Sequence, residues 1–227
     1  MKTLCIDIGG TGIKAIVLDA AGAPVTERVR TETPRPADPE PVLAVVDHLA
    51  RAQGDFDRVS VGFPGVVKDG VTRTAPNLAP SWGGFPLAAE LERRTGKPAR
   101  VANDAAIQGL GVVDGDGVEM VITLGTGLGS CIYVGGKFVP LELGHHPFEK
   151  GETYEERVSN AALKRIGKKR WNKRVRRIVA QLDATFNYKR LYLGGGNAKF
   201  VKKSGLPDDV TIVDNVAGLL GGIRLWS

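Results

Sequence analysis

The sequence contains little cysteine and no long apolar run. Its two cysteines, Cys5 and Cys131, each lie in an apolar stretch, which favours buried thiols over a disulfide and leaves no zinc site that they could form. No apolar run approaches the roughly 18 residues that a membrane-spanning helix needs. The N-terminal residues lead into a strand pattern without a basic and apolar leader. We therefore expect a cytoplasmic protein with no membrane partner.

Two glycine-rich turns dominate the pattern instead. The first glycine turn (residues 9–12) lies within LCIDIGGTGIKAIV, and the second glycine turn (residues 125–127) lies within MVITLGTGLGSCIYVGGKFV. Neither is followed by the Gly-Lys-Ser/Thr of a P-loop, and neither gives GxGxxG, so P-loop and Rossmann folds are disfavoured. Glycine readily takes positive φ, so we expect both turns to direct N–H groups at a phosphate. A tight β-hairpin is the alternative for either turn alone, but two matching turns favour phosphate binding.

The surrounding pattern repeats and predicts an internally duplicated α/β protein. Each turn joins the first two of three short strands, the third of which covers residues 25–31 in the first half. A helix and the strand 58–63 follow there, and helices with the strand 191–193 follow in the second half. We expect two lobes, 1–113 and 114–227, with the last helix as a candidate to pack back on the first lobe.

Other segments of the first half place candidate residues. Residues 69–85 are polar and rich in turn residues, which predicts a loop layer over a site. A helix is predicted from Pro86 to Arg94, and a short buried strand, 99–102, delivers Asn103 and Asp104 to the next helix.

In the second half, two helices are predicted after residue 152. Thr153 and Glu156 form a capping-box pattern for a helix that runs to about Ile166, and a second helix spans roughly 168–186. Its apolar stripe consists of Trp171, Val175, Ile178 and Leu182. A strand is predicted at 210–213, with Asp214 and Asn215 capping a final helix.

Positive charge is concentrated near the C-terminus. Residues 1–150 hold 15 Lys and Arg against 18 Asp and Glu, whereas residues 151–227 hold 16 against 7. Nine of the 14 residues in the basic segment (residues 164–177) are Lys or Arg. A solvated helix face explains some of these side chains, but charge this dense also suggests an anionic partner such as polyphosphate, nucleic acid or anionic lipid. No recognisable nucleic-acid module accompanies it, and we expect no nucleic-acid partner.

Seven short motifs, in order, resemble the ROK family of the actin-like sugar kinase superfamily. They are DIGGTGIK, VGFPGVV with TAPNL, AND-AA, LGTGLGS with ELGH, and LGGG. Within that family the chain looks similar to the polyphosphate glucokinases, which also lack the cysteine-rich zinc motif that many relatives carry after the histidine of ELGH, His145. The resemblance implies an actin-like (ribonuclease H-like) fold with two mixed sheets flanked by helices, an active site in the cleft, and often a homodimer.

Transfer of a phosphoryl group to a sugar hydroxyl needs a base near that hydroxyl and polar groups that orient the sugar. Asp104 is the candidate base, since a carboxylate at the start of a helix stays ionised, although a plain helix cap is the alternative for Asn103 or Asp104. The candidate glucose ligands are Asn77, Asn103, Asp104, Glu142 and His145. The resemblance implies that the Glu-x-Gly-His motif, residues 142–145, contacts the anomeric end of the sugar.

The donor is expected at the glycine turns. The candidate phosphate-binding residues are Gly9, Gly10, Thr11, Gly12, Lys14, Thr123, Gly125, Thr126, Gly127, Gly194, Gly195 and Gly196. Asp7 is the candidate ligand, through water, of a magnesium ion, and no zinc is expected. A polyphosphate track is predicted along Lys168, Lys169, Arg170, Lys173 and Arg174.

The predicted function is therefore polyphosphate-dependent glucokinase, with ATP as a further possible donor. A strictly ATP-dependent ROK hexokinase and a non-catalytic ROK protein that senses sugar or binds nucleic acid are the alternatives. The candidate base and the absence of a helix-turn-helix favour an enzyme.

Overall fold

The computed structural model describes residues 1–213 and 217–227, which form two compact units. Unit 1 comprises Met1–Gly111 with Gly218–Ser227, and unit 2 comprises Val112–Ala217. The predicted cap at Asp214 and Asn215 lies outside the described residues. No helix in the described part of the chain has the length and apolar character needed to cross a membrane.

Unit 1 contains a five-stranded mixed sheet in the order β3-β2-β1-β4-β7. Its elements are β1 (Thr3–Ile8), β2 (Ile13–Leu18), β3 (Val29–Thr31), α1 (Pro39–Gln53), β4 (Arg58–Phe63), β5 (Val67–Lys68), β6 (Val71–Thr72), a 3₁₀ turn (Pro80–Trp82), α2 (Leu87–Thr95), β7 (Ala99–Asn103), α3 (Asp104–Leu110) and α6 (Ala217–Arg224). The central strand β1 pairs antiparallel with β2 and parallel with β4, and β4 pairs parallel with β7.

Unit 2 repeats this arrangement as β10-β9-β8-β13-β14. Its elements are β8 (Val118–Leu124), β9 (Leu128–Val134), β10 (Lys137–Leu141), a 3₁₀ turn (Leu143–His145), β11 (Pro147–Glu149), β12 (Glu152–Thr153), α4 (Tyr154–Val158), α5 (Asn160–Phe186), β13 (Arg190–Gly194), a 3₁₀ turn (Ala198–Phe200) and β14 (Val210–Ile212). Here β8 pairs antiparallel with β9 and parallel with β13, which pairs parallel with β14. The predicted duplication and the α/β fold with two mixed sheets are confirmed.

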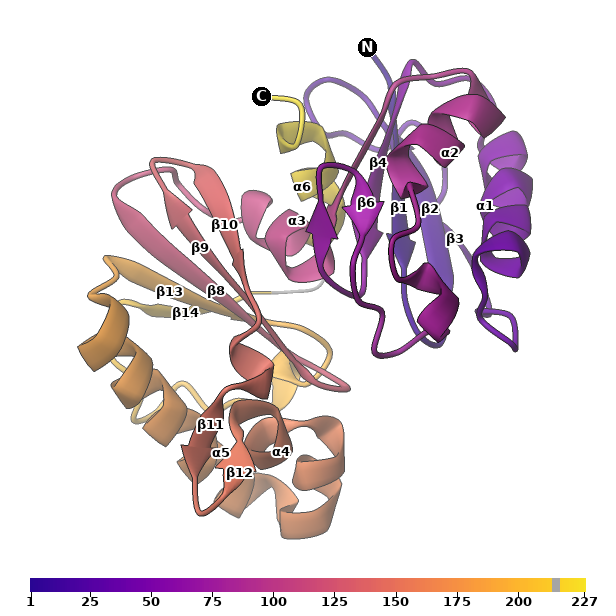
Figure 1. Ribbon diagram of the computed structural model, residues 1–227. Helices are drawn as coiled ribbons and strands as arrows, with labels where there is room; N and C mark the ends of the chain where they lie inside the picture. The colour runs from indigo at the N-terminus through magenta and orange to yellow at the C-terminus, as the bar shows by residue number, and fades with distance from the viewer. Residues whose placement is uncertain (214–216) are drawn as a thin grey trace. The chain divides into compact units, whose positions relative to one another are not determined.

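Successive side chains of β1 point to opposite faces of the unit 1 sheet, and helices cover both faces (Figure 1). Leu4, Ile6 and Ile8 join the core that α1 and α2 complete, whereas Cys5 points to the opposite face and clusters with Ile223 of α6. Both cysteines are buried and unoxidised, as predicted, and burial raises the pKa of each thiol to about 12.

The helices after residue 152 differ in part from the sequence prediction. The capping box of Thr153 and Glu156 is present, but α4 ends at Val158, because Ser159 leaves helical geometry and caps α5. The expected break at residue 167 is real, since Gly167 has φ 75° inside α5. The predicted stripe is buried: Trp171 and Leu182 are fully enclosed, and Val175 and Ile178 nearly so.

Two segments of unit 1 differ from the sequence prediction, one with more regular structure than expected and one with a shorter strand. Residues 69–85 are not simply a loop layer, because they contain β6 and a 3₁₀ turn that buries Trp82 completely. The indole N–H of Trp82 donates to the carbonyl of Ala37 at 2.8 Å. The third strand covers Val29–Thr31 rather than 25–31.

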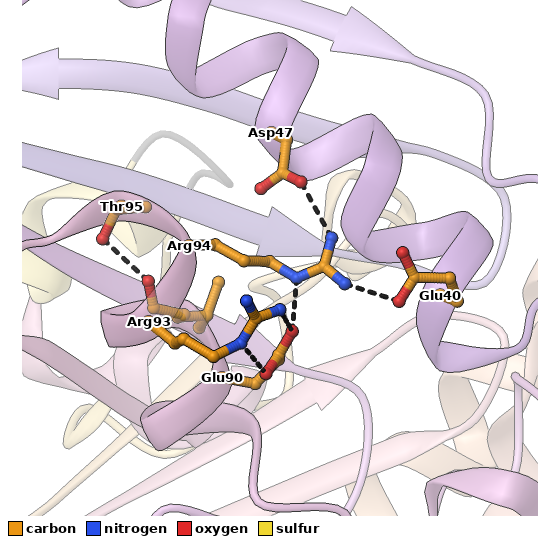
Figure 2. Close-up of polar contacts among 7 residues, drawn as sticks. Glu40, Asp47, Glu90, Arg93, Arg94 and Thr95 are labelled. Carbon is orange, nitrogen blue, oxygen red and sulfur yellow. Dashed lines mark hydrogen bonds and ion pairs between the residues drawn. The ribbon is translucent and has the colours of Figure 1, made fainter.

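An ion-pair cluster joins α1 and α2 in unit 1 (Figure 2). Arg94, whose side chain is 12% exposed, donates to Glu90, Asp47 and Glu40 at 2.5–2.8 Å. Hydrogen bonds from Arg93 and Arg94 lower the pKa of Glu90 from 4.5 to about 2. Glu90 therefore stabilises the fold above pH 4.5, and that contribution is lost as the pH falls from about 4.5 toward 2.

We predict that Arg94→Met lowers the free energy of unfolding at pH 7 by about 1–2 kcal/mol, because three carboxylates lose a largely buried partner. The free energy of unfolding of this variant should also change less between pH 4.5 and pH 2 than that of the wild type, because the pKa of Glu90 rises toward its ordinary value. Urea unfolding at several pH values measures both effects. Arg93→Ala, which removes a largely exposed cation from the same Glu90, is the matched control and should cost much less. Equal losses in the two variants would contradict the role given to Arg94.

Candidate active site

The candidate residues of unit 1 lie where its parallel strands end. β1, β4 and β7 run in the same direction, so their carboxyl ends share one edge of the sheet. The first glycine turn follows β1, Pro64 and Gly65 follow β4, and Asp104 follows β7. This edge of a parallel sheet is where α/β proteins commonly bind ligands.

The glycines of the first turn serve close packing rather than positive φ. Gly9, Gly10 and Gly12 all lack the positive φ that we expected, and the N–H of Gly9 donates to the carbonyl of Gly12 at 3.0 Å. A Cβ on Gly12 would lie 2.6 Å from the Arg30 guanidinium. On Gly10 it would lie 3.0 Å from Asn77, which places this candidate sugar ligand against the turn.

The carbonyl groups of the first turn are held by three side chains. Thr33 Oγ1 donates to the Gly9 carbonyl at 2.5 Å, Arg35 Nη2 donates to Gly10 at 2.7 Å, and Arg30 Nη2 donates to Thr11 at 3.1 Å. Thr33 is buried, whereas both arginines are exposed. All three donors come from β3 and the segment that follows it.

Asp7 and Lys14 form an ion pair on the first two strands. Lys14 Nζ donates to Asp7 Oδ2 at 2.7 Å, and each side chain is about one third exposed. A Cβ on Gly62 would lie 3.8 Å from Asp7 Oδ1 and 3.7 Å from the Cα of Asp104. The structure thus brings the candidate metal ligand and the candidate base to the same point of the sheet edge.

Asn103 is the helix cap of α3, and Asp104 is its first residue. Asn103 Oδ1 accepts from the N–H groups of Ala105 and Ala106 at 2.9 and 3.3 Å, and its Nδ2 donates to Gly65 at 3.1 Å. Asp104 Oδ1 accepts from the N–H of Ala105 at 2.7 Å. The cap occupies the side-chain oxygen of Asn103, so only Nδ2 retains an N–H that can donate to a sugar hydroxyl.

In unit 2, the second glycine turn and the glycine triplet, residues 194–196, lie side by side. Gly194 is paired with Thr123 across β13 and β8, and a Cβ on Gly195 would lie 2.5 Å from the Leu124 carbonyl. Gly195 has φ 86°, so glycine is required there for its conformation as well as for space.

The second turn is also closed by an internal backbone hydrogen bond, which is one residue shorter in span than that of the first. The N–H of Gly125 donates to the carbonyl of Gly127 at 3.0 Å. The Gly125 carbonyl accepts from the N–H of Asn160 at 2.8 Å and from Asn197 Nδ2 at 3.2 Å. Thr126, at the tip, is exposed. Donors from other segments thus hold the Gly125 carbonyl, as they hold the carbonyls of the first turn.

The Glu-x-Gly-His motif forms a short turn after β10. His145 Nε2 lies 3.8 Å from Glu142 Oε2, and both side chains are about half exposed. Partial burial raises the pKa of Glu142, with nearby Glu155 adding to the shift and His145 opposing it. Glu155 of α4 accepts from the N–H of Leu128 at 3.2 Å, and a Cβ on Gly127 would clash with its carboxylate at 2.1 Å.

The basic segment presents only part of its charge to solvent. Arg165 and Arg177 pair with Glu152 and Glu149, and Arg174 donates to the Arg157 carbonyl at 3.1 Å. Lys169, Arg170 and Lys173 are exposed, with no ion-pair partner within residues 1–213 and 217–227.

Phe200 joins this helix to the segment that follows the glycine triplet. Lys168 Nζ lies 4.5 Å and Lys199 Nζ 5.2 Å from the centre of the Phe200 ring. Buried Asn172 of α5 donates to the carbonyl of Phe200 and accepts from the N–H of Lys202. Cations from two parts of the chain therefore lie near the same aromatic ring.

The sequence did not predict the side chains that form hydrogen bonds with the backbone of the two turns or of the residue that follows. They are Arg30, Thr33, Arg35, Glu155 and Asn197. Each acts through a contact distant in sequence, and no local motif marks it. The one available signal was that the glycines of each turn leave space for a neighbour.

Comparisons with known proteins agree with the motifs. A family model described as "ROK family" matches residues 3–154. A polyphosphate glucokinase of Mycobacterium tuberculosis (strain CDC 1551 / Oshkosh) is 29% identical, with 95% of this chain aligned to 88% of that protein. The crystal structure of an inorganic polyphosphate/ATP-glucomannokinase from Arthrobacter sp. strain KM is 33% identical, with a TM-score of 0.87, and covers 100% of this chain and 99% of its own. A ROK family glucokinase from Streptomyces griseus, in complex with glucose and AMPPNP, shares the fold at 22% identity and a TM-score of 0.83, over 99% of both chains.

Proposed function

The chain belongs to the ROK family, and from this premise we propose that it transfers a phosphoryl group from polyphosphate, with ATP as a second donor, to the 6-hydroxyl of glucose. The relatives that match nearly the whole chain support this proposal, since they are named for polyphosphate and for glucose or mannose phosphorylation. The observation that carries it is the duplicated sheet, because each unit has a glycine turn at the carboxyl end of its central strand and donors from other segments hold carbonyls of the first turn and the Gly125 carbonyl of the second.

In the proposed reaction, Asp104 acts as the general base. Its carboxylate accepts the proton of the 6-hydroxyl while that oxygen forms a bond to the terminal phosphorus of the donor. The bond from phosphorus to the bridging oxygen breaks, and a chain one phosphate shorter leaves. Asp104 is half-buried at the first position of α3, a rigid element, which supports a fixed approach to the sugar.

A divalent cation is expected of kinases that use ATP or polyphosphate, and we propose Mg²⁺ held through water by Asp7. No group of three His, Cys, Asp or Glu side chains in the described residues is arranged to hold a metal. Mg²⁺ keeps several waters and takes one or two carboxylates with substrate phosphates, so the single carboxylate of Asp7 fits it. When bound, it would neutralise charge on the phosphates. Lys14 holds Asp7 Oδ2 and leaves Oδ1 turned toward Gly62.

We propose that polyphosphate follows the cations of unit 2. Asn197 contacts the second glycine turn, Lys199 comes two residues later, and Lys199 and Lys168 both lie near the ring of Phe200. Like charges gathered on one ring repel each other, and a polyanion would offset that repulsion. From Lys168 the exposed cations Lys169, Arg170 and Lys173 continue along α5. Arg174 is less suited, because its guanidinium is partly buried against Arg157.

Glu142 and His145 are proposed to bind hydroxyls of glucose together with the amides of Asn77 and Asn103. A homodimer, a cytoplasmic location and the absence of nucleic-acid and membrane partners remain predictions.

We predict that Asp104→Asn lowers kcat by about 10²–10⁴, the usual contribution of a general base. Glucose affinity should change little, because the amide keeps the shape of the carboxyl group and base catalysis acts on the transition state. Asp55→Asn, at an exposed acidic residue of the same unit, is the control. Wild-type turnover in Asp104→Asn would refute the assignment.

We predict that Glu142→Ala and His145→Ala each weaken glucose binding by about 1–3 kcal/mol, with a smaller effect on kcat. Because the pKa of Glu142 is raised, its carboxylate takes up a proton at a higher pH than an ordinary glutamate does. Glucose affinity in the wild type should therefore fall at a pH above 4.5 as the solution is acidified.

Calorimetric titration of glucose across pH measures both effects. Glu142→Gln should bind more weakly at neutral pH but lose the acid-dependent decline. His146→Ala, which removes the neighbouring exposed imidazole, is the matched control for His145. Unchanged affinity in the Glu142 and His145 variants would place the sugar elsewhere.

We predict that neutralising the exposed track raises the KM for long-chain polyphosphate by about tenfold or more and makes it less dependent on salt, because fewer counterions are released. The KM for ATP should change much less. The substituted residues, each changed to Gln, are Lys168, Lys169, Arg170 and Lys173.

A second variant removes the same charge from other exposed sites. Its Gln substitutions are at Arg28, Arg51, Lys97 and Lys137. If both variants raised the KM for polyphosphate equally, general charge would account for donor binding and the track on α5 would be rejected.

A further inference from the structure

We propose that Thr33, Arg35 and Arg30 are positioning residues that aim the amide groups of the first glycine turn at the donor phosphate. This inference rests on the proposed function in one respect, since it takes the ligand of the turn to be a phosphate chain. It adds residues that no motif in the sequence marks. They act on the donor through the backbone of the turn.

The direction of the amides follows from peptide geometry. In a trans peptide, the carbonyl and the N–H of one planar unit point in opposite directions. The carbonyls of Gly9, Gly10 and Thr11 point to Thr33, Arg35 and Arg30. The N–H groups of the same three peptide units, which belong to Gly10, Thr11 and Gly12, therefore point to the other side.

Each of these three successive N–H groups thus points away from the side chain that holds the carbonyl of its own peptide unit. Successive backbone N–H groups can form an anion-binding concavity. The N–H of Gly9 is turned inward to the Gly12 carbonyl, so it closes the turn and leaves the next three amides to face a ligand. Hydrogen bonds accepted by the carbonyls also polarise these amides and make them stronger donors, most of all where the donor is a charged guanidinium.

Close packing prevents the turn from adopting another conformation. The Arg30 guanidinium occupies the place where a side chain on Gly12 would begin, and Asn77 does the same at Gly10. Thr33 is buried, so loss of its hydroxyl would leave the Gly9 carbonyl without that donor in a site largely shielded from water.

The second glycine turn has the same device, built from different residues. Its Gly125 carbonyl accepts from Asn160 and from the buried Asn197, which turns the N–H of Thr126 to the opposite side. Both turns of the duplicated fold thus have a carbonyl held by donors from other segments, three carbonyls in the first turn and that of Gly125 in the second. This recurrence is what a functional requirement on amide direction would produce.

The test measures donor binding separately from catalysis. Thr33→Val removes the hydroxyl and keeps the shape of the side chain, and Arg35→Gln removes the charged donor. We expect each to weaken the binding of tripolyphosphate, measured by calorimetry, and to raise the KM for the donor about tenfold, as loss of one hydrogen bond implies. The KM for glucose should stay within about twofold, and Thr33→Ser should restore donor binding.

Thr72→Val is the matched control. Thr72 is buried in the same unit, and its hydroxyl donates to the Trp82 carbonyl at 2.5 Å, away from the turn. It should lose similar stability and keep the donor KM of the wild type. Arg28→Gln serves in the same way for Arg35→Gln, because it removes one exposed arginine close to β3.

Each outcome decides between the possibilities. Unchanged donor affinity in Thr33→Val and Arg35→Gln would overturn the inference, as would equal weakening by Thr72→Val, which would indicate general loosening. If the wild type phosphorylated no sugar but its variants still lost tripolyphosphate binding, the inference would stand and the glucokinase proposal would fall. A wild type that bound no tripolyphosphate would overturn both.

Discussion

Parallel pairing at the centre of each sheet decides where the chemistry can occur. β1 has an antiparallel neighbour on one side and the parallel strand β4 on the other, and β8 has the same two relations with β9 and β13. The antiparallel partner makes a tight turn at the carboxyl edge, and the parallel partner ends there too. Glycine turns, Asp104 and the glycine triplet therefore come to the carboxyl edges of the two sheets without any long loop.

Close packing against the backbone is the second constraint on the glycine turns at these edges. Neither glycine turn uses positive φ; both use the absence of a Cβ, because Arg30 lies over Gly12 and Glu155 lies over Gly127. Substitution at either position would displace a charged side chain that itself bonds to the turn or to the next residue. The chemistry of the turn thus depends on side chains that approach from outside the motif.

The sequence predicted what depends on periodicity and local signals. Repetition of strand, turn and strand indicated the duplicated sheets, and the stripe through Trp171 and Leu182 indicated the buried face of α5. It could not reveal that Ser159 ends one helix and caps the next, because a single serine within a helical pattern is weak evidence. Thr33 and Asn197 escaped for a different reason, since their roles arise only when distant segments pack together.

The contacts of α5 divide the cations of unit 2 into two groups. The apolar stripe and Asn172 take the buried positions of α5, and acidic residues of β11 and β12 pair with Arg165 and Arg177. Ion pairs therefore account for the arginines nearest the hairpin, whereas, within the described residues, Lys168 and Lys199 contact the Phe200 ring rather than a carboxylate. A solvated face would favour cations spread apart, whereas Asn172 fixes the segment of Lys199 against the helix of Lys168. Holding like charges together costs stability in the absence of an anion, so their placement is better explained by a bound polyanion than by solubility.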